Sequence, residues 1–320
     1  ERYVLQPSVN HSPTFRKYFY PNNGEGIYKV GAGYTLPGHL AEYILITEDE
    51  IDADCLIKIP NLSIPFAHAA IAEPLSCCIS AQEHHLHLLS DDLKSRREIK
   101  RGVLNDGILV IIGAGMMGRM NLDIAISSMP SVIIVSDFIK ERLEIVEGLF
   151  RERTERLNIN LVLSDPDKLE QLIQEYSSGK GADDVIVAVG NKKAVEDAQF
   201  LVGRGGVLDI FGGLARNDDQ INLSTGRVHY DEISIVGSSG GIPWDIKRAI
   251  ELMSDQKIEP SAHIMRVCNL EDVPEVLNLM QDKKLDGKAI VYPHIKLDHQ
   301  IDKRTWTKKD EESLLFNYNN

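Results

Sequence analysis

The sequence predicts an α/β protein built on a doubly wound parallel sheet, with a mostly β part divided around that sheet. Apolar runs of buried-strand type alternate with helical periodicities after residue 105, and a glycine-rich turn follows the first of these runs. Short apolar runs separated by turn residues fill the first hundred residues. We therefore expect a β-rich part and connecting helix over 1–103, the parallel sheet over 104–241, and a return to the first part over 242–320.

Composition excludes several classes of protein. The 320 residues contain 35 basic and 48 acidic side chains, a net charge of −13, which argues against a nucleic-acid partner. No apolar run approaches the roughly 18–20 residues of a membrane span. The four cysteines form no Cys-x-x-Cys pair, so they predict neither a four-cysteine zinc site nor a disulfide framework, and they favour the cytoplasm. The chain opens without Met, apparently inside a strand, so we expect a longer protein.

The first hundred residues are expected to be strands, then one long helix. Turn signals lie at 21–24 and 36–39. A helix is expected from 65 to about 89, followed by a charged linker over 91–101. The expected strands are 4–5, 27–30, 42–46 and 55–59.

The central part alternates strands with amphipathic helices. Ile139, Leu143, Val146 and Phe150, for example, are spaced 4, 3 and 4 and so share one helical face. Later helices are expected near 243–255 and 270–282. Thr307 and Asp310 have the spacing of a capping box in the polar tail. The expected strands are 108–112, 132–135, 161–163, 185–189, 207–211, 233–237 and 289–292.

The glycine-rich turn reads Gly113-Ala114-Gly115-Met116-Met117-Gly118, the pattern G-x-G-x-x-G. The pattern alone is weak, but here it follows a buried strand and opens a helix. Gly113 permits the tight turn, Gly115 permits close approach of a pyrophosphate to the helix N-terminus, and Gly118 permits close helix–strand packing. We predict a dinucleotide site here, with a glycine-rich turn that binds nothing as the alternative.

Asp137 supports that prediction. It follows the second strand and lies 19 residues after Gly118. A carboxylate at this place accepts hydrogen bonds from the adenosine ribose and repels a 2′-phosphate, so it favours NAD(H) over NADP(H). A simple cap of the following helix is the alternative. Arg142 either lies near the adenosine or is a solvated helix residue.

Small residues end the later strands as well. Ligands of open α/β sheets bind outside the carboxyl ends of the strands, where small residues let a dinucleotide lie against the backbone. A second G-x-G at 31–33 lacks the strand–helix context and is read as a turn. The further cofactor-binding candidates are Val189, Gly190, Gly212, Gly213, Ser238 and Ser239.

With these residues assembled, the chain resembles the medium-chain zinc-dependent alcohol and polyol dehydrogenases over essentially its whole length. The matching segments read GHLAEY (38–43), AEPLSC (72–77) and DGKAIV (286–291), and the last third is similar to sugar-type members of the L-sorbose 1-phosphate reductase kind. The resemblance implies a Rossmann domain plus a partial GroES-like catalytic domain. It also implies hydride transfer with NAD(H) and zinc, with Glu73 at or near the metal.

The chain departs from the family in its metal ligands. The family's Cys and Gly-His-Glu segment would precede residue 1, and its four-cysteine lobe is absent, so Glu73 is the one ligand candidate and zinc is doubtful in this chain. His84 and His87, three apart on the expected long helix, are read as partly exposed helix residues rather than ligands. Cys77 and Cys78 are read as small core residues. His229 and Lys288 stay open between a site role and an ordinary surface role.

These observations favour an NAD(H)-dependent enzyme that interconverts a hydroxyl and a keto group on a sugar, polyol or sugar phosphate. The alternative is a non-catalytic or truncated dinucleotide-binding protein without zinc. The resemblance further implies a homodimer or homotetramer. Catalytic acid–base residues are not assigned.

Overall fold

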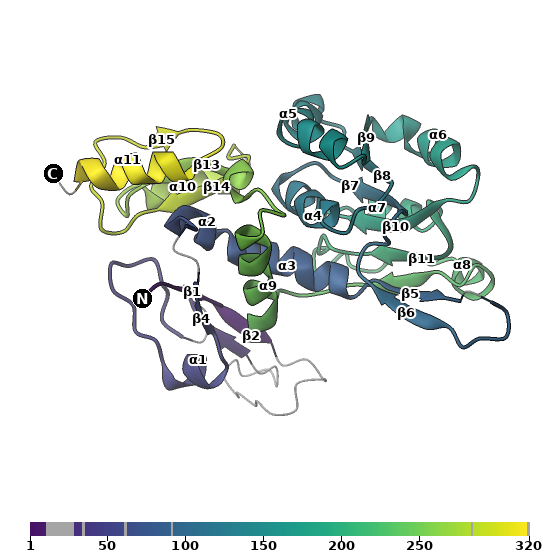
Figure 1. Cartoon of the computed structure of the whole chain (residues 1–320), viewed down its shortest axis with the longest axis horizontal. Coiled ribbons are helices and arrows are strands. Elements are labelled where there is room, and N and C mark those ends of the chain that lie inside the picture. The colour runs from purple at the N-terminus through teal and green to yellow at the C-terminus, as the bar shows by residue number, and fades with distance from the viewer. Residues whose placement is uncertain (11–28, 34–35, 61–62, 91, 283, 319–320) are drawn as a thin grey trace. The chain divides into compact units, whose positions relative to one another are not determined.

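The computed structural model describes residues 1–10, 29–33, 36–60, 63–90, 92–282 and 284–318 (Figure 1). The chain divides into two compact units. The first unit consists of residues 1–77 and 239–320, and the second of residues 78–238. Among the described helices, none is both long and apolar enough to cross a membrane.

The second unit is built on a six-stranded parallel sheet in the order β12-β11-β10-β7-β8-β9. The order reverses between β7 and β10, as it does in doubly wound sheets, which confirms the predicted fold class. The strands are β7 (Ile108–Ile112), β8 (Val132–Ser136), β9 (Asn160–Ser164), β10 (Ala182–Val187), β11 (Val202–Asp209) and β12 (Ser234–Val236).

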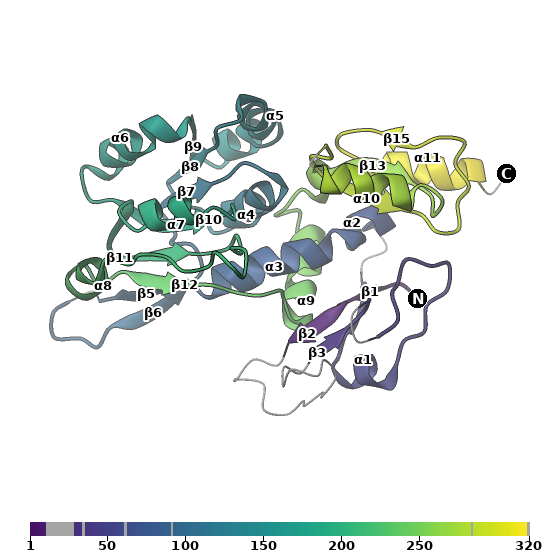
Figure 2. The same cartoon turned by 180° about the vertical axis from the view of Figure 1, so that it is seen from behind.

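Helices cover both faces of this sheet, as Figures 1 and 2 show. Successive strand residues point to opposite faces, so Leu109 packs with α4 and α5 while Val110 packs with α6 and α7. Both residues are fully buried. The helices are α4 (Met116–Ile126), α5 (Lys140–Arg156), α6 (Pro166–Ser177), α7 (Lys192–Ala198) and the short α8 (Thr225–Tyr230).

Most central strand predictions are confirmed, with shifted bounds at two places. The strands predicted at 185–189 and 207–211 lie earlier, at β10 and β11, so Val189 and Phe211 stand beyond the strand ends. The earlier start of β11 is explained by Gly205, whose positive φ of 72° lets the strand bend rather than end.

The long helix predicted over 65–89 is wrong. It is interrupted at Ile71, giving α2 (Phe66–Ala70) and α3 (Ala72–Glu83). The expected charged linker is also wrong, because β5 (Leu86–Leu89) and β6 (Glu98–Arg101) pair as an antiparallel hairpin. Strand β5 contacts β11, so this hairpin covers part of the central sheet.

Within its described residues, the first unit contains three small sheets, paired as β1-β4, β2-β3 and β14-β13-β15. The strand predicted at 42–46 is wrong. That segment is irregular, and Tyr43 and Leu45 are exposed. The strand predicted at 27–30 lies partly outside the described residues. The elements are β1 (Tyr3–Leu5), β2 (Ser8–Asn10), β3 (Lys29–Gly31), α1 (Glu48–Asp52), β4 (Leu56–Lys58), α9 (Pro243–Ser254), a 3-10 turn (Pro260–His263), β13 (Ile264–Cys268), α10 (Val273–Gln281), β14 (Lys288–Val291), β15 (Ile301–Asp302) and α11 (Lys308–Tyr318).

The predicted capping box at the start of α11 is confirmed. The backbone N–H of Thr307 donates to Asp310 Oδ2 at 2.9 Å, and the N–H of Asp310 donates back to the Thr307 hydroxyl at 3.4 Å. Directly after Asp310, the buried Glu311 carboxylate accepts hydrogen bonds from the N–H groups of Phe66 and Ala67, at 2.7 and 2.8 Å. The C-terminal helix thus caps the N-terminus of α2 with a carboxylate, the charge that this helix end favours.

Candidate functional site

The glycine turn between β7 and α4 packs as its pattern predicts. Gly113 has a φ of +107°, a conformation that glycine adopts without strain. A Cβ on Gly118 would stand 1.8 Å from the Gly113 carbonyl oxygen, so only glycine lets the helix come this close to the turn.

The ends of β10 and β11 close on the same turn. A Cβ on Gly113 would stand 2.5 Å from Val189 Cγ1, one on Gly190 would stand 2.7 Å from the Gly213 oxygen, and one on Gly212 would stand 2.5 Å from the Val189 backbone. Five residues that the sequence singled out as separate strand ends therefore meet at one edge of the sheet, backbone against backbone.

Gly115 differs from these packed glycines. It is the N-cap of α4, and the nearest atom to a Cβ built there is Arg142 Nη1, at 4.0 Å. The N-terminus of α4 is therefore left open on this side, with the half-buried Met116 and Met117 beginning the helix. An open helix N-terminus next to a guanidinium suits an anionic group such as a pyrophosphate.

Asp137 lies at this opening and is 7% exposed. Its Oδ2 accepts the N–H of Ala114 at 2.8 Å and lies 3.5 Å from Arg142 Nη1, and its Oδ1 accepts the N–H of Ile139 at 2.9 Å. It therefore braces the glycine turn and also turns the chain toward α5. Each carboxylate oxygen can accept a further hydrogen bond, so these contacts leave capacity for ribose hydroxyls.

We call Gly113, Gly115, Gly118, Gly190 and Gly212 the glycine site. Its tight turn, open helix N-terminus and adjoining carboxylate fit the pyrophosphate and ribose of a dinucleotide. Ser238 follows β12 in the same unit, whereas Ser239 belongs to the first unit.

The one metal-ligand candidate, Glu73, stands in the first turn of α3. Its Oε1 lies 3.8 Å from Cys77 Sγ, one helical turn on. Burial raises the pKa of the Cys77 thiol to about 11, with the negative charge of Glu73 adding to the rise and the positive charge of Lys288 opposing it.

These residues do not fit a zinc site. Within the part of the chain that the structure describes, no three His, Cys, Asp or Glu side chains gather so that they could hold a metal ion. Glu73 and Cys77 supply two donors at most.

The sequence missed a cluster of buried charges under the hairpin. His85 Nδ1 lies 2.7 Å from Asp184 Oδ1, and its Nε2 lies 3.2 Å from Asp209 Oδ2. His87 Nε2 lies 3.0 Å from the same Asp184 oxygen, whose partner oxygen accepts the N–H of Leu104 at 2.9 Å. We call His85, His87, Asp184 and Asp209 the His–Asp cluster; all four side chains are buried.

The cluster is charged. Both ring nitrogens of His85 face carboxylates, and only the imidazolium can donate from both. Burial alone would lower the pKa of His85, but its hydrogen bonds to Asp184 and Asp209 outweigh that effect and raise it to about 9. Burial would raise the pKa of Asp184, but its hydrogen bonds to His85 and His87 lower it to about 2.

The reading of His84 and His87 as partly exposed helix residues is wrong, because both lie beyond the end of α3 at Glu83 and His87 is buried in β5. His85 and His87 share a face, because this segment is extended and alternates, while His84 is exposed. Cys78 is fully buried, as expected, whereas Cys77 is half-buried beside Glu73. His229 is exposed on α8, and Lys288 is half-buried at the start of β14.

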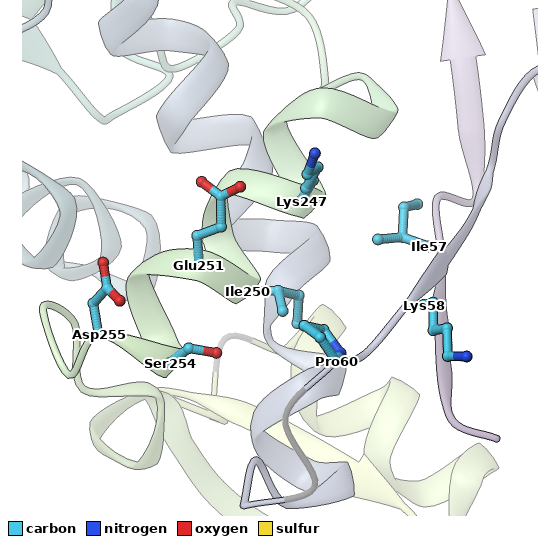
Figure 3. A pocket seen from close by; sticks show the side chains of 8 residues that line it. All are labelled: Ile57, Lys58, Pro60, Lys247, Ile250, Glu251, Ser254 and Asp255. Atoms are coloured by element: carbon cyan, nitrogen blue, oxygen red, sulfur yellow. The ribbon is translucent and has the colours of Figure 1, made fainter.

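A further hollow of about 470 Å³ lies in the first unit where β4 meets α9 (Figure 3). Ile57, Pro60 and Ile250 form its apolar part, with two lysines and two acidic residues around it. The opposite charges balance, so the hollow has no preference for a charged ligand.

The fold and the glycine site define a Rossmann-type protein, and comparison with known proteins shows which proteins it is similar to. Residues 117–255 match the zinc-binding dehydrogenase family. The chain is 31% identical to mannitol-1-phosphate 5-dehydrogenase from Aliivibrio fischeri, over 84% of this chain and 64% of that protein. It is 26% identical to L-sorbose 1-phosphate reductase from Klebsiella pneumoniae, over 81% and 62%.

The fold matches solved structures as well. The 2R,3R-butanediol dehydrogenase from Bacillus subtilis superposes with a TM-score of 0.70 at 16% identity, covering 92% of this chain and 74% of that one. The chain therefore contains a zinc-binding dehydrogenase domain over residues 117–255 and is similar over most of its length to sugar-phosphate dehydrogenases and reductases. It spans just under two thirds of the length of the two curated relatives.

Proposed function

We propose that the protein is an NAD(H)-dependent oxidoreductase that interconverts a hydroxyl and a keto group on a sugar, polyol or sugar phosphate. The observation that carries the proposal is the glycine site with Asp137 at its opening. The substrate class rests on the two curated relatives, which are named for reactions of sugar phosphates.

In this proposal the chain's own residues bind and orient the cofactor. The open N-terminus of α4 and Arg142 hold the pyrophosphate, and Asp137 accepts hydrogen bonds from the adenosine ribose. The packed glycines at the ends of β10 and β11 let the cofactor lie against the backbone. Bound NAD(H) supplies the hydride carrier: the alcohol loses a hydride to NAD⁺ and a proton to solvent or base, giving the ketone and NADH.

The proposed step is derived without zinc. The described residues offer Glu73 and do not complete a metal site. We therefore assign Glu73 the place of a candidate ligand only and derive no metal-bound step.

Asp137 is the residue that tests the cofactor part. In Asp137→Ser the ribose loses an acceptor and a 2′-phosphate meets no carboxylate. We expect NADH to bind about tenfold more weakly, since a hydrogen bond to a charged group contributes roughly 1.5 kcal/mol, and NADPH to bind more tightly. Fluorescence titration of both cofactors measures this. Asp167→Ser, an exposed aspartate of α6, is the matched control and should change neither affinity. Unchanged affinities in Asp137→Ser would place the ribose elsewhere.

A turnover assay separates the proposal from its alternative, a dinucleotide-binding protein without catalysis. The product of the complete gene is assayed for NADH oxidation with ketoses and ketose phosphates, and its metal content is measured on the same sample. Oxidation with a member of this panel supports the enzyme. Tight NADH binding without turnover and without stoichiometric metal would support the alternative. Absence of turnover on every member, in a sample with stoichiometric zinc, would contradict the enzyme proposal.

A further inference from the structure

The β5–β6 hairpin is oriented with its polar side inward. His87 is 2% exposed, whereas its neighbours Leu86 and Leu88 are 37% and 62% exposed. Ile99, which pairs with Leu88 across the hairpin, is also exposed. Water-facing leucines above buried histidines reverse the usual pattern of a sheet that covers a core.

The His–Asp cluster fixes this orientation. A shift of one residue along β5 would turn the leucines inward, but it would also leave Asp184 and Asp209 buried without their histidine partners. The pairing of the histidines with these aspartates therefore forces the apolar side chains of the hairpin to face solvent. Exposed apolar patches mark interaction surfaces.

The tip of the hairpin carries more basic than acidic side chains. Asp92 Oδ1 accepts the N–H groups of Lys94 and Ser95, at 2.6 and 2.8 Å, and this turn leaves Leu93 fully exposed. Segment 90–101 has five basic and three acidic residues, in a chain whose net charge is −13. Among the described residues, none of these five basic side chains has an ion-pair partner. Two such hairpins would repel each other, so charge favours an acidic partner surface.

The same unit carries a surface of the opposite character. A hollow of about 370 Å³ lies between α5 and the end of β9, with Leu143 and Leu163 at its base. Glu144, Glu147 and Asp165 line it together with one basic residue, Lys140. Glu147 is paired with Arg151, whereas the carboxylates of Glu144 and Asp165 have no hydrogen-bond or ion-pair partner within the described part of the chain.

The tip cannot reach this hollow within one copy. The hairpin is fixed to β10 and β11, while the hollow lies at β9, the far edge of the sheet. Four strand spacings of about 4.8 Å separate β11 from β9, about 19 Å in all. Figures 1 and 2 show the β5–β6 hairpin and α5 at opposite ends of this unit.

We propose that the hairpin tip of one copy docks into the α5–β9 hollow of a second copy. Leu93 packs against Leu143 and Leu163, and the basic tip residues pair with Glu144 and Asp165. The contact joins two different surfaces, so it is heterologous and leads to a ring or an open chain of copies. It is small, so association is weak, concentration-dependent and sensitive to salt.

Mixing two damaged variants tests the heterologous contact. The variant Leu93→Asp removes the apolar contact of the tip and leaves the hollow unchanged. The double variant Glu144→Lys with Asp165→Lys reverses the charge of the hollow and leaves the tip unchanged. In sedimentation velocity, each variant alone should lose the concentration-dependent rise in sedimentation coefficient that the wild type shows at low salt. In a mixture of the two variants, the sedimentation coefficient should again rise with concentration, because each variant supplies the surface that the other lacks. The rise should stop at a pair of molecules, since only one contact can form.

Phe200→Asp is the matched control, since it removes an equally isolated apolar side chain, 61% exposed, after α7. It should keep the wild-type behaviour. Leu93, Glu144 and Phe200 are exposed and Asp165 is half-buried, and unchanged circular dichroism confirms that each variant folds. A wild type without concentration dependence, or a mixture that behaves as its two components do alone, would overturn the proposal.

A disulfide gives a second, independent readout. Leu93→Cys combined with Glu144→Cys should form chain-to-chain links under mild oxidation, visible on a non-reducing gel, because the two positions are too far apart to link within one copy. Phe200→Cys with Glu144→Cys should not. Equal linking in both double variants would show random collision and also sink the proposal.

Discussion

The glycine site and the His–Asp cluster lie in the same unit and are built by opposite means. The glycine site has almost no side chains: its shape comes from backbone atoms that approach to distances no Cβ allows. The cluster is made of side chains only, and its geometry comes from ionic hydrogen bonds among four buried groups. The glycine site should therefore be disrupted by added side-chain atoms that overlap with the backbone. The His–Asp cluster should be disrupted by the loss of one of its charges, so the two regions should respond to different substitutions.

The largest effect is expected from Asp184→Ala. It leaves a buried imidazolium facing one carboxylate instead of two, and it removes the acceptor for the Leu104 N–H. Breaking a buried pair from one side costs about 3–5 kcal/mol of unfolding free energy. Denaturant unfolding followed by circular dichroism measures it. Asp167→Ala, an exposed acid in the same unit, should stay within about 0.5 kcal/mol of the wild type. A loss below about 1 kcal/mol for Asp184→Ala would mean that the cluster is not charged.

The next effect is the pH dependence that the cluster gives to the stability of the fold. The folded-state pKa of His85, about 9, lies above the ordinary histidine value of 6.5. Its stabilising contribution is therefore complete below pH 6.5 and is lost as the pH rises through about 9. The pKa of Asp184 is depressed to about 2 from 3.8, so its contribution is present above pH 3.8 and is lost as the pH falls through about 2. We expect a loss on the order of 2–3 kcal/mol between pH 6.5 and 9.5.

Two histidine variants isolate this pH effect. His85→Gln should flatten the stability profile above pH 6.5, while His84→Gln, which changes the exposed neighbour, should keep the wild-type slope. Unfolding midpoints across a pH series report both. Equal slopes in the wild type and His85→Gln would assign the pH dependence to other groups.

A smaller change in stability, with a specific loss of binding, is expected at the glycine site. Gly118→Ala places a methyl group 1.8 Å from the Gly113 oxygen, so the helix must move away from the turn. Overpacking of this kind costs about 1–3 kcal/mol, and NADH affinity should fall because the N-terminus of α4 is displaced.

Gly148→Ala is the matched control for this substitution. It lies in α5 with no atom within 4 Å of the new Cβ, so it should stabilise the fold by up to about 1 kcal/mol and leave binding intact. Thermal unfolding and NADH titration of the two variants give the comparison. Equal NADH affinities in both would contradict the role given to the Gly113–Gly118 packing.

The contrast between the two regions also explains what could be predicted from sequence. The glycine site is local: Gly113 to Gly118 fall in six consecutive residues, and Asp137 follows the next strand. Strand β7 was predicted with its correct bounds because its five apolar residues are buried on both faces. Periodicity and turn chemistry act over a few residues, and here they were sufficient.

The cluster could not be found in this way. His85 meets partners 99 and 124 residues away, and no local pattern marks them. The run from Ala81 to Leu89 was read as helix because Ala, Gln and Leu favour helices, yet His85 and His87 are drawn to Asp184 in an extended segment. The signal that could have found it was two aspartates, Asp184 and Asp209, in strands otherwise apolar enough to be buried.

The separation of His85 from its partners also sets an order of events during synthesis. A ribosome adds about 5–20 residues per second, so Asp184 is made roughly 5–20 s after His85, and Asp209 later still. Throughout that interval the hairpin sequence has emerged without the two strands it must cover. Its leucines and histidines are then equally exposed, because the partners that determine which of them face the sheet have not yet been made. Which side of the hairpin packs on the sheet is therefore decided only after β10 and β11 have been synthesised. Docking of the hairpin onto the sheet is thus a late step in the folding of the nascent chain.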